Sequence, residues 1–243
     1  MTCLITNWYG RNGNNILQLT KALYYCYKFN MSEVKFPSHP LLKSCSITLS
    51  KSQSDTIVKG MFYNQDNMIE LDVDKMRELS LNYILPILNI KPVKSELTIG
   101  HIRGGDIFTK NPHPEYVQPP LSYYETLRPH LIVHEDNRNP CVQALKKRGY
   151  TLQSKDLKED LGALLGASNV VCSHSTFSLM AFFLNENLKY IHVPGELVTH
   201  MRKSVNLELD SKKIKKHIFH NYIQEGEWGN SQEQLSMMLS YVV

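Results

Sequence analysis

The chain has 243 residues, of which 42% are hydrophobic and 21% are charged, a composition typical of a globular protein with one large domain or two smaller units. Its 27 basic and 23 acidic side chains leave a net charge of +4, which does not by itself indicate nucleic acid. The basic residues also lack the interleaved aromatic residues of a nucleic-acid surface, whereas a few arginines would suit a small anionic ligand.

The cysteines and the hydropathy exclude several other classes. The five cysteines are scattered and form no CxxC pair, so they are neither a disulfide framework nor a zinc pattern, and they favour a reducing compartment. The N-terminal segment becomes polar too soon for a signal peptide, and no run approaches the roughly 20 apolar residues of a membrane span. We therefore expect a soluble, cytoplasmic protein without a membrane span.

The first part of the chain predicts the start of an α/β layer. The apolar residues 3–6 predict a strand, which a glycine-containing turn connects to a helix over 14–29 with apolar residues at helical spacing. Residues 31–70 are mixed. A second helix is predicted over 72–88, with Asp72 in the N-cap position.

The segment 90–96 contains two lysines and a proline and shows no apolar periodicity, so we interpret it as a hinge. This hinge divides the chain into two units, residues 1–92 and residues 93–243. In the second unit, short apolar runs alternate with helical patterns, which predicts a parallel sheet covered by helices on both faces. The predicted strands are 97–103, 130–135, 151–154, 169–173 and a final strand 189–194, and the predicted helices are 121–129, 140–150, 156–167, 175–185 and a surface helix 210–222.

Three polar segments stand where a predicted strand ends, which is where open α/β sheets bind ligands. The first is "GRNGNN", residues 10–15. Gly10 and Gly13 allow positive φ and a close approach of the backbone to a ligand, and the free amides of the following helix suit an anion or a polar sugar. Neither a Lys-Ser/Thr pair nor GxGxxG is present, so this is not a standard nucleotide loop. Taken alone, the segment is better explained as a tight turn with Asn14 and its neighbours as caps.

The second segment is "HIRGGD", residues 101–106. Arg103 leaves the end of a strand and is suited to clamp a phosphate with two hydrogen bonds. His101 alternates with it and points to the same face of the strand. Asp106 either bonds the backbone of its own turn or orients the arginine. A glycine turn with an Arg–Asp surface pair is the purely structural alternative.

The third segment is "CSHSTFSLMAFFL", residues 172–184. A helix needs one capping hydroxyl, but this junction carries four: Ser173, Ser175, Thr176 and Ser178. Together with the positive end of the helix dipole, these hydroxyl groups would form a cradle for a pyrophosphate. We favour this interpretation over a capped helix with spare serines.

Two further features bear on the chemistry. Asp72 and Asp74 form an acid-x-acid pair that could hold a divalent metal, but capping of the predicted helix explains Asp72 equally well, and we prefer no metal. Glu70, Asp72 and Asp74 nevertheless remain the best carboxylates of the first unit for general-base work. The loop 111–124 is rich in proline and tyrosine and either packs on itself or forms the wall of a sugar site, with Tyr116 and Tyr123 as candidate acceptor contacts.

In this order, the three segments resemble the fucosyltransferase superfamily of the α-1,2 type, which is related to the α-1,6 and protein O-fucosyltransferases. Its members carry a Gly-x-x-Gly-Asn turn before a helix, a His-x-Arg-Arg-x-Asp motif, and an Asp-Leu pair followed by a strand and Ser-x-Ser-Thr-Phe-Ser. Here "GRNGNNILQLTKAL", "HIRGGDIF" and "EDLGALLGASNVVCSHSTFS" are similar to these motifs, over about residues 3–194. The second arginine of the central motif is Gly104 in this chain, and the chain is short.

The resemblance implies an α/β fold of the GT-B type, with two Rossmann-like lobes of which the N-terminal, acceptor-side lobe (1–92) is reduced and the C-terminal lobe (93–243) binds a nucleotide-sugar donor. It implies inverting, metal-independent transfer to a glycan or glycoprotein, without a cofactor. Arg103 would bind the donor pyrophosphate. The other implied donor contacts are Gly13, Asn14, His101, Asp136, Asn137, Ser173, His174, Ser175, Thr176, Phe177 and Ser178. Because of the two departures, a UDP-pentose such as UDP-xylose is a serious alternative to GDP-fucose as donor, as in compact viral sugar transferases that resemble this group.

The predicted mechanism follows from the charge that develops in the reaction. Departure of a nucleoside diphosphate builds negative charge, which Arg103 and the helix start at 175–178 would stabilise. The acceptor hydroxyl would lose its proton to a carboxylate, with Asp72 as first choice and Asp74, Glu70 and Asp106 behind it. Two alternatives stay open: a non-catalytic module that binds a nucleotide or a glycan, and a GT-A enzyme that uses manganese on Asp72 and Asp74.

Overall fold

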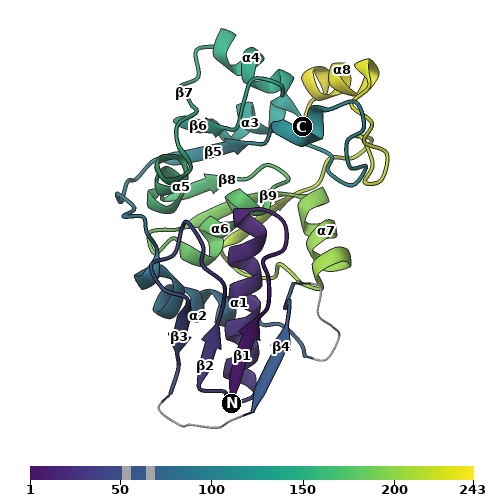
Figure 1. The fold of residues 1–243 in the computed structure, drawn as a ribbon. Coiled ribbons are helices and arrows are strands. Elements are labelled where there is room, and N and C mark those ends of the chain that lie inside the picture. Colours follow the sequence, from purple (N-terminus) through teal and green to yellow (C-terminus); the bar gives the residue numbers. More distant parts are fainter. Residues whose placement is uncertain (51–55, 64–68) are drawn as a thin grey trace.

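A computed structural model describes residues 1–50, 56–63 and 69–243, and shows an α/β architecture with two sheets (Figure 1). The N-terminal sheet has the order β3-β2-β1-β4; β1 pairs in parallel with β2 and β4, and β3 is antiparallel to β2. Its strands are β1 (Thr2–Ile5), β2 (Glu33–Lys35), β3 (Ser46–Thr48) and β4 (Ile57–Gly60).

The C-terminal sheet has the order β10-β9-β8-β5-β6-β7, and all its pairings in the described residues are parallel. The chain runs outward from β5 to β7 and then returns to place β8 on the other side of β5, so the direction of winding reverses between β5 and β8. This reversal opens a crevice at the carboxyl ends of the two strands. The strands are β5 (Thr98–Ile102), β6 (Leu131–His134), β7 (Leu152–Gln153), β8 (Asn169–Val171), β9 (Tyr190–Pro194) and β10 (Ile214–His217).

Helices connect and cover the strands, and most begin at a recognisable cap. Asp72 accepts a hydrogen bond from the Lys75 amide at 2.9 Å, which confirms the predicted helix start. That helix continues as a π turn (Ser80–Ile84) and a short 3-10 turn (Leu85–Ile87). The helices are α1 (Asn12–Lys28), α2 (Val73–Leu79), a 3-10 turn (Gly105–Phe108), α3 (Leu121–Leu127), α4 (Pro140–Lys147), α5 (Leu157–Gly166), α6 (Thr176–Leu184), α7 (Gly195–Val205) and α8 (Gln232–Ser240).

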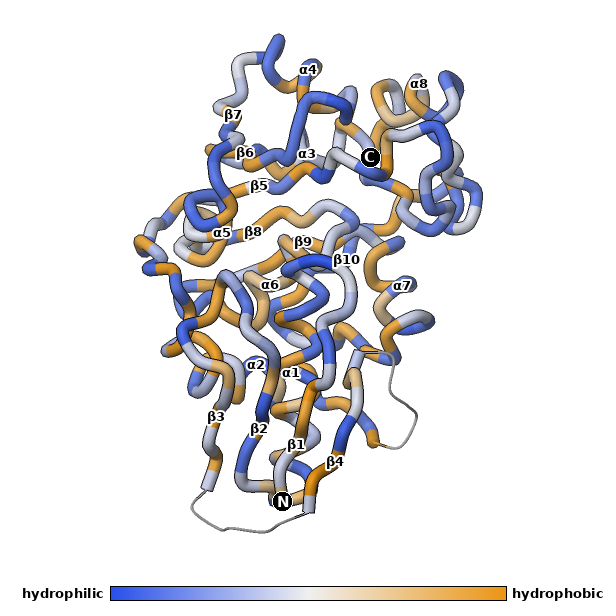
Figure 2. Tube along the Cα trace, in the orientation of Figure 1, coloured by the Kyte–Doolittle hydropathy of each residue, from blue (hydrophilic) through white to orange (hydrophobic). Residues whose placement is uncertain are grey.

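Helices α1 and α6 pack against each other between the two sheets (Figure 1). Residues 178–184 of α6 are all buried, as expected for a helix that is apolar on every side, and α6 and β8 are mainly hydrophobic in Figure 2. One hydrophobic cluster contains residues from both sides of the predicted hinge, for example Leu19 and Phe182. The two parts of the chain therefore share a core. A second cluster, with Trp228 and Tyr124, lies on the other face of the C-terminal sheet.

Most predicted elements are confirmed, but the last third contains corrections. The surface helix predicted over 210–222 is wrong: Ile214–His217 forms the edge strand β10, which pairs with β9, so the strand at 189–194 is not the final one. Ile214 is buried against the sheet while Lys215 and Lys216 are exposed, which is compatible with an edge strand. Helices α7 and α8 were not predicted, although α8 begins with a capping box between Ser231 and Gln234. In the described residues no helix is long and apolar enough to cross a membrane.

Candidate functional site

A cavity of about 710 Å³ lies at the carboxyl ends of β5, β6 and β8, where the winding of the C-terminal sheet reverses. All three polar segments of the sequence contribute to its wall. The residues predicted as site residues that line it are Gly13, Asn14, His101, Arg103, Asp106, Tyr116, His174, Ser175, Thr176 and Phe177.

The amino ends of α1 and α6 meet at this cavity. A Cβ atom on Gly13 would lie 2.5 Å from the backbone nitrogen of Phe177, so only glycine permits this approach of the two helices. The Thr176 hydroxyl donates to Asn14 Oδ1 at 2.6 Å, and Ser175 caps α6 by accepting from the Phe177 amide. The sequence-based expectation of positive φ holds for Gly10 (φ +68°), whereas Gly13 is required for the close contact. Two helix dipoles thus present their positive ends to one cavity.

Arg103 stands at the end of β5 with its guanidinium held on several sides. Its Nη2 donates to the Asp106 carboxylate at 3.2 and 3.4 Å, and its Nη1 donates to the His174 carbonyl at 3.4 Å. Its Cζ lies 4.5 Å from the centre of the Tyr116 ring, at cation–π distance. Only 17% of the side chain is exposed. The arginine is therefore oriented before any ligand arrives.

A second guanidinium reaches the same place from the N-terminal part of the chain. Arg11 forms ion pairs with Asp106 at 3.2 Å and with Glu135 at 2.7 Å, so Asp106 Oδ1 contacts both arginines. The hydrogen bond to Glu135 is the main cause that raises the pKa of Arg11. The positive charge that the sequence lacks at Gly104 is therefore present in space, supplied by a residue just before α1.

The turn after β5 accounts for the two glycines of "HIRGGD". A Cβ atom on Gly104 would lie 2.5 Å from Asp136 Oδ1, and Gly105 has φ +67°. Asp136 accepts hydrogen bonds from the Gly105 amide at 3.0 Å and from the Arg138 side chain at 2.8 Å. Asp136 therefore holds the turn. Neither it nor the exposed Asn137 lines the cavity, so the structure does not bring these two expected donor contacts together with the others.

His101, Ser173 and Ser178 support the cavity wall from beneath. His101 is buried, its Nδ1 lies 2.8 Å from Ser173 Oγ, and burial lowers its pKa to about 3, so it is neutral at ordinary pH. Ser178 is fully buried and donates to the Ser175 carbonyl. These groups tie β5 to β8 and shape the start of α6, whereas Ser175 and Thr176 face the cavity itself.

The carboxylates favoured from the sequence as general bases lie elsewhere. Asp72 is occupied as a helix cap, Asp74 accepts from the Ser211 hydroxyl at 2.6 Å, and neither they nor Glu70 line the cavity. The reason is that α2 packs at the carboxyl end of α6, where Arg77 donates to the carbonyls of Phe182 and Asn185. The cavity lies at the opposite end of this 9-residue helix, roughly 13 Å away at 1.5 Å per residue.

The two tyrosines chosen as acceptor contacts differ in their environment. Tyr116 lies in the cavity wall beneath Arg103. Tyr123 is 1% exposed, donates to the His192 carbonyl at 3.0 Å and belongs to the second hydrophobic cluster, so the choice of this residue is corrected. Two tyrosines that were not selected, Tyr9 and Tyr63, form a ring pair in the wall at 4.7 Å.

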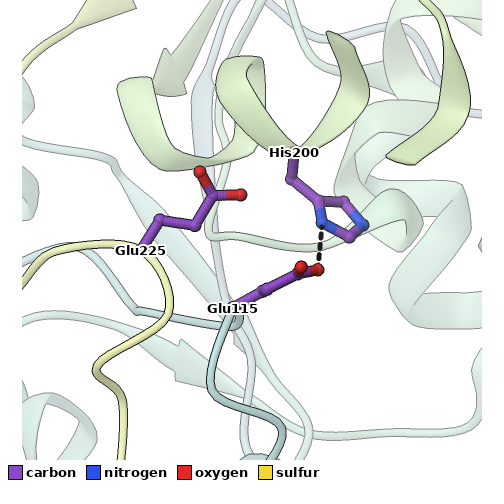
Figure 3. A group of neighbouring side chains, drawn as sticks. All are labelled: Glu115, His200 and Glu225. Atoms are coloured by element: carbon purple, nitrogen blue, oxygen red, sulfur yellow. Dashed lines mark ion pairs between the residues drawn. The ribbon is translucent and has the colours of Figure 1, made fainter. Parts of the chain in front are cut away.

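A group of histidines and glutamates forms the end of the cavity beside α7. The rings of His174 and His200 lie 5.3 Å apart, each close to Tyr116. His200 Nδ1 lies 3.3 Å from Glu115 Oε2 (Figure 3). Burial is the main cause that lowers the pKa of both histidines, which are therefore neutral at neutral pH. This histidine–glutamate group was not identified from the sequence, because loop 111–124 and α7 are far apart along the chain.

One cluster of potential metal ligands occurs in the described residues, namely Glu115, His200 and Glu225, whose donor atoms lie within 4.8 Å of one another (Figure 3). Lys203 Nζ lies 3.1 Å from Glu225, so an ammonium group already neutralises one of the two carboxylates. Glu115, in contrast, faces the neutral imidazole of His200.

The other end of the cavity lies beyond β6 and β7. Val133, Ser154 and Leu157 line it together with Asp160, whose carboxylate accepts from the Gln153 side chain at 2.8 Å and from the Lys155 amide at 3.1 Å. Asp160 is the aspartate of the Asp-Leu pair quoted above, but it was not selected as a site residue. No protein-family model, curated protein or solved structure matches this chain.

Proposed function

We propose that the protein is an inverting, metal-independent glycosyltransferase that moves a sugar from a nucleotide-sugar donor to a glycan hydroxyl. The observation that carries the proposal is the convergence of two guanidinium groups and two helix amino ends on one cavity. The cavity lies where the winding of the parallel sheet reverses between β5 and β8, and α/β proteins bind nucleotides at such a position.

A diphosphate fits the charges of this part of the cavity. Arg11 and Arg103 share the carboxylate of Asp106, and a diphosphate offers the same guanidinium groups more oxygen atoms and more charge than one carboxylate. The amides at the starts of α1 and α6 and the hydroxyls of Ser175 and Thr176 are further donors. We infer that the diphosphate replaces Asp106 as the partner of Arg11.

The same groups supply catalysis. As the bond between the sugar and the β-phosphate breaks, negative charge grows on the leaving oxygen, and groups already oriented toward it stabilise the transition state more than the substrate. In this scheme, guanidinium groups and helix dipoles provide the positive charge that a divalent metal provides in other transferases.

The resemblance to the fucosyltransferase superfamily supports a GT-B-like arrangement, with the donor on residues 93–243 and the acceptor approaching from the smaller unit. The presence of two separate sheets on either side of the α1–α6 layer is consistent with it. GDP-fucose and UDP-xylose are the two donors to test, and the acceptor class is a glycan or glycoprotein.

The decisive experiment measures binding and turnover side by side. GDP, UDP, GDP-fucose and UDP-xylose are added to the protein in a thermal-shift panel, because a ligand that binds the folded state raises its melting temperature. Release of free nucleoside diphosphate from the sugar-linked form is then followed in excess chelator. We expect stabilisation by one nucleotide family and turnover without metal. A protein that binds nucleotide and never releases it from the sugar is a binding module, and loss of turnover in chelator would support the manganese alternative.

A further inference from the structure

Two regions of the cavity differ chemically, one near Arg103 and the other at the end beside α7. Near Arg103 it offers positive charge and N–H donors, whereas beside α7 it offers neutral imidazole rings and the Tyr116 ring. A phosphate has little to bind at the second end, but a sugar hydroxyl has both an acceptor for its proton and a ring on which to pack.

His174 indicates that a hydrogen-bond donor of a bound ligand fits at this second end. It is 1% exposed, and its Nδ1 lies 3.1 Å from the Val117 carbonyl, so Nδ1 carries the hydrogen and Nε2 carries a lone pair. In the described residues Nε2 has no hydrogen-bond partner. A buried acceptor without a partner destabilises the fold, and a hydroxyl group of a bound ligand would satisfy it.

His200 is the neighbouring imidazole, and its surroundings favour one tautomer. Its buried Nδ1 faces Glu115 Oε2 at 3.3 Å, a contact whose geometry falls short of a well-aligned hydrogen bond. A hydrogen on Nδ1 is stabilised by this carboxylate, which leaves the lone pair on Nε2. In Figure 3 the second ring nitrogen of His200 lies on the side away from Glu115. A carboxylate behind an imidazole is the arrangement that makes histidine an effective base.

The other carboxylates that line the cavity are engaged. Asp106 and Glu135 pair with the arginines, and Asp160 accepts from Gln153 and Lys155. Glu115 differs from them because its carboxylate faces the imidazole of His200, at 3.3 Å from Nδ1.

We propose that His200, oriented by Glu115, is the general base that accepts the proton of the acceptor hydroxyl. This inference rests on the proposed glycosyl transfer. The acceptor oxygen forms a bond to the anomeric carbon, the bond between that carbon and the phosphate oxygen breaks with its electron pair going to the diphosphate, and the hydroxyl proton passes to His200 Nε2. Glu115 then faces an imidazolium and stabilises its charge.

The position of Tyr116 agrees with this chemistry. Its ring centre lies 4.5 Å from Arg103 Cζ and 5.5 Å from the centre of the His200 ring. A sugar packed on Tyr116 would therefore have both the guanidinium that receives its leaving group and the base within reach. Inversion further requires the leaving group and the acceptor to stand on opposite faces of the anomeric carbon.

The pH dependence follows from the groups around His200. Burial lowers its pKa, while Glu115 and Glu225 raise it and His113 lowers it. His174 also faces it, and Glu196 and Lys203 lie on the same helix. The neutral imidazole is the active form, so transfer is lost as pH falls through the pKa of His200. Removal of the Glu115 charge lowers that pKa and moves the acidic limb to lower pH.

The test uses the full chain with GDP-fucose or UDP-xylose and a panel of methyl glycosides as acceptors. His200→Ala is expected to lower kcat by roughly 100-fold or more with unchanged nucleotide affinity, and added imidazole is expected to restore part of the rate. Glu115→Gln, whose side chain is 39% exposed and therefore tolerant of change, is expected to lower kcat and shift the acidic limb to lower pH. His220→Ala, an exposed histidine outside the cavity, is the matched control.

The outcomes separate this inference from the proposed function. Normal transfer in His200→Ala, or an unchanged acidic limb in Glu115→Gln, overturns the role of the dyad while glycosyl transfer stands. If transfer requires a divalent metal and chelator abolishes it, the cluster of Figure 3 acts as a metal site and the dyad is wrong. If wild-type protein binds no nucleotide, or binds one without turnover, both proposals are overturned.

Discussion

Arginines Arg77 and Arg103 stand at opposite ends of helix α6 and have similar surroundings but different uses. Both guanidinium groups contact backbone carbonyls, and both lie near an aromatic ring, Phe182 in one case and Tyr116 in the other. Arg77 is 7% exposed and binds the fixed carbonyls at the carboxyl end of the helix. Arg103 pairs with the carboxylate of Asp106, which is 52% exposed, and under the proposed function a phosphate of the donor competes for this guanidinium. The comparison therefore predicts that Arg77 stabilises the fold, whereas Arg103 binds the donor.

The largest effect separating the two ends is expected for Arg103→Ala. Loss of the oriented guanidinium removes a donor that acts on the transition state, so transfer falls by roughly 100-fold or more. The free energy of unfolding changes little, because the Asp106 partner remains solvated. Initial rates of nucleoside diphosphate release test this, and near-normal turnover would reject the role of Arg103.

Arg77→Met tests the carboxyl end of α6, where we expect an effect on stability and none on nucleotide binding. The substitution leaves two buried carbonyls unpaired, and we expect a loss of about 2 kcal/mol in the free energy of unfolding. Nucleotide affinity measured on the folded variant should equal that of the wild type. Urea denaturation followed by circular dichroism measures the first quantity. A stable variant that binds nucleotide more weakly would show that the two ends of α6 are not independent.

Arg11→Gln has a smaller expected effect than Arg103→Ala. The Arg11 side chain is 62% exposed, so its charge is partly screened, and we expect roughly tenfold weaker nucleotide binding. The affinity should also lose part of its salt dependence, since one positive charge is gone. Isothermal titration at two salt concentrations measures both. Equal affinities would mean that the diphosphate leaves the Arg11–Glu135 pair intact.

The smallest expected effect is that of Asp72→Ala. Loss of the cap destabilises α2 by about 1 kcal/mol, while donor affinity and transfer stay at wild-type values. A large fall in transfer with intact folding would restore Asp72 as the base and contradict the placement of the cavity at the other end of α6.

Much of the fold was predictable because its signals are local. The periodicity of α1, the N-cap of α2 and the polar residues that follow β5 and β8 can each be read from a short stretch of sequence. The strand at Ile214–His217 was not recognised because its pattern of lysines around one buried isoleucine is equally compatible with a surface helix. Only pairing with β9 distinguishes the two.

The candidate site was predictable in part for the same reason. Arg103, Ser175 and Thr176 were identified because they follow strands directly. Arg11 and Glu115 lie in two segments that the sequence singled out, residues 10–15 and 111–124, but neither was selected as a site residue. His200 was missed because nothing near it in the chain distinguishes it from a surface residue.

The sequence by itself determined which segments form strands and helices and which junctions are polar, because hydrophobic periodicity, glycine and capping residues act over a few residues. The tertiary structure alone decided that β8 lies beside β5, that α1 and α6 meet at Gly13, and that Arg11 and His200 reach the same cavity as Arg103. These contacts join residues far apart in the chain. They depend on the order of the strands and the packing of whole helices, which no local pattern encodes.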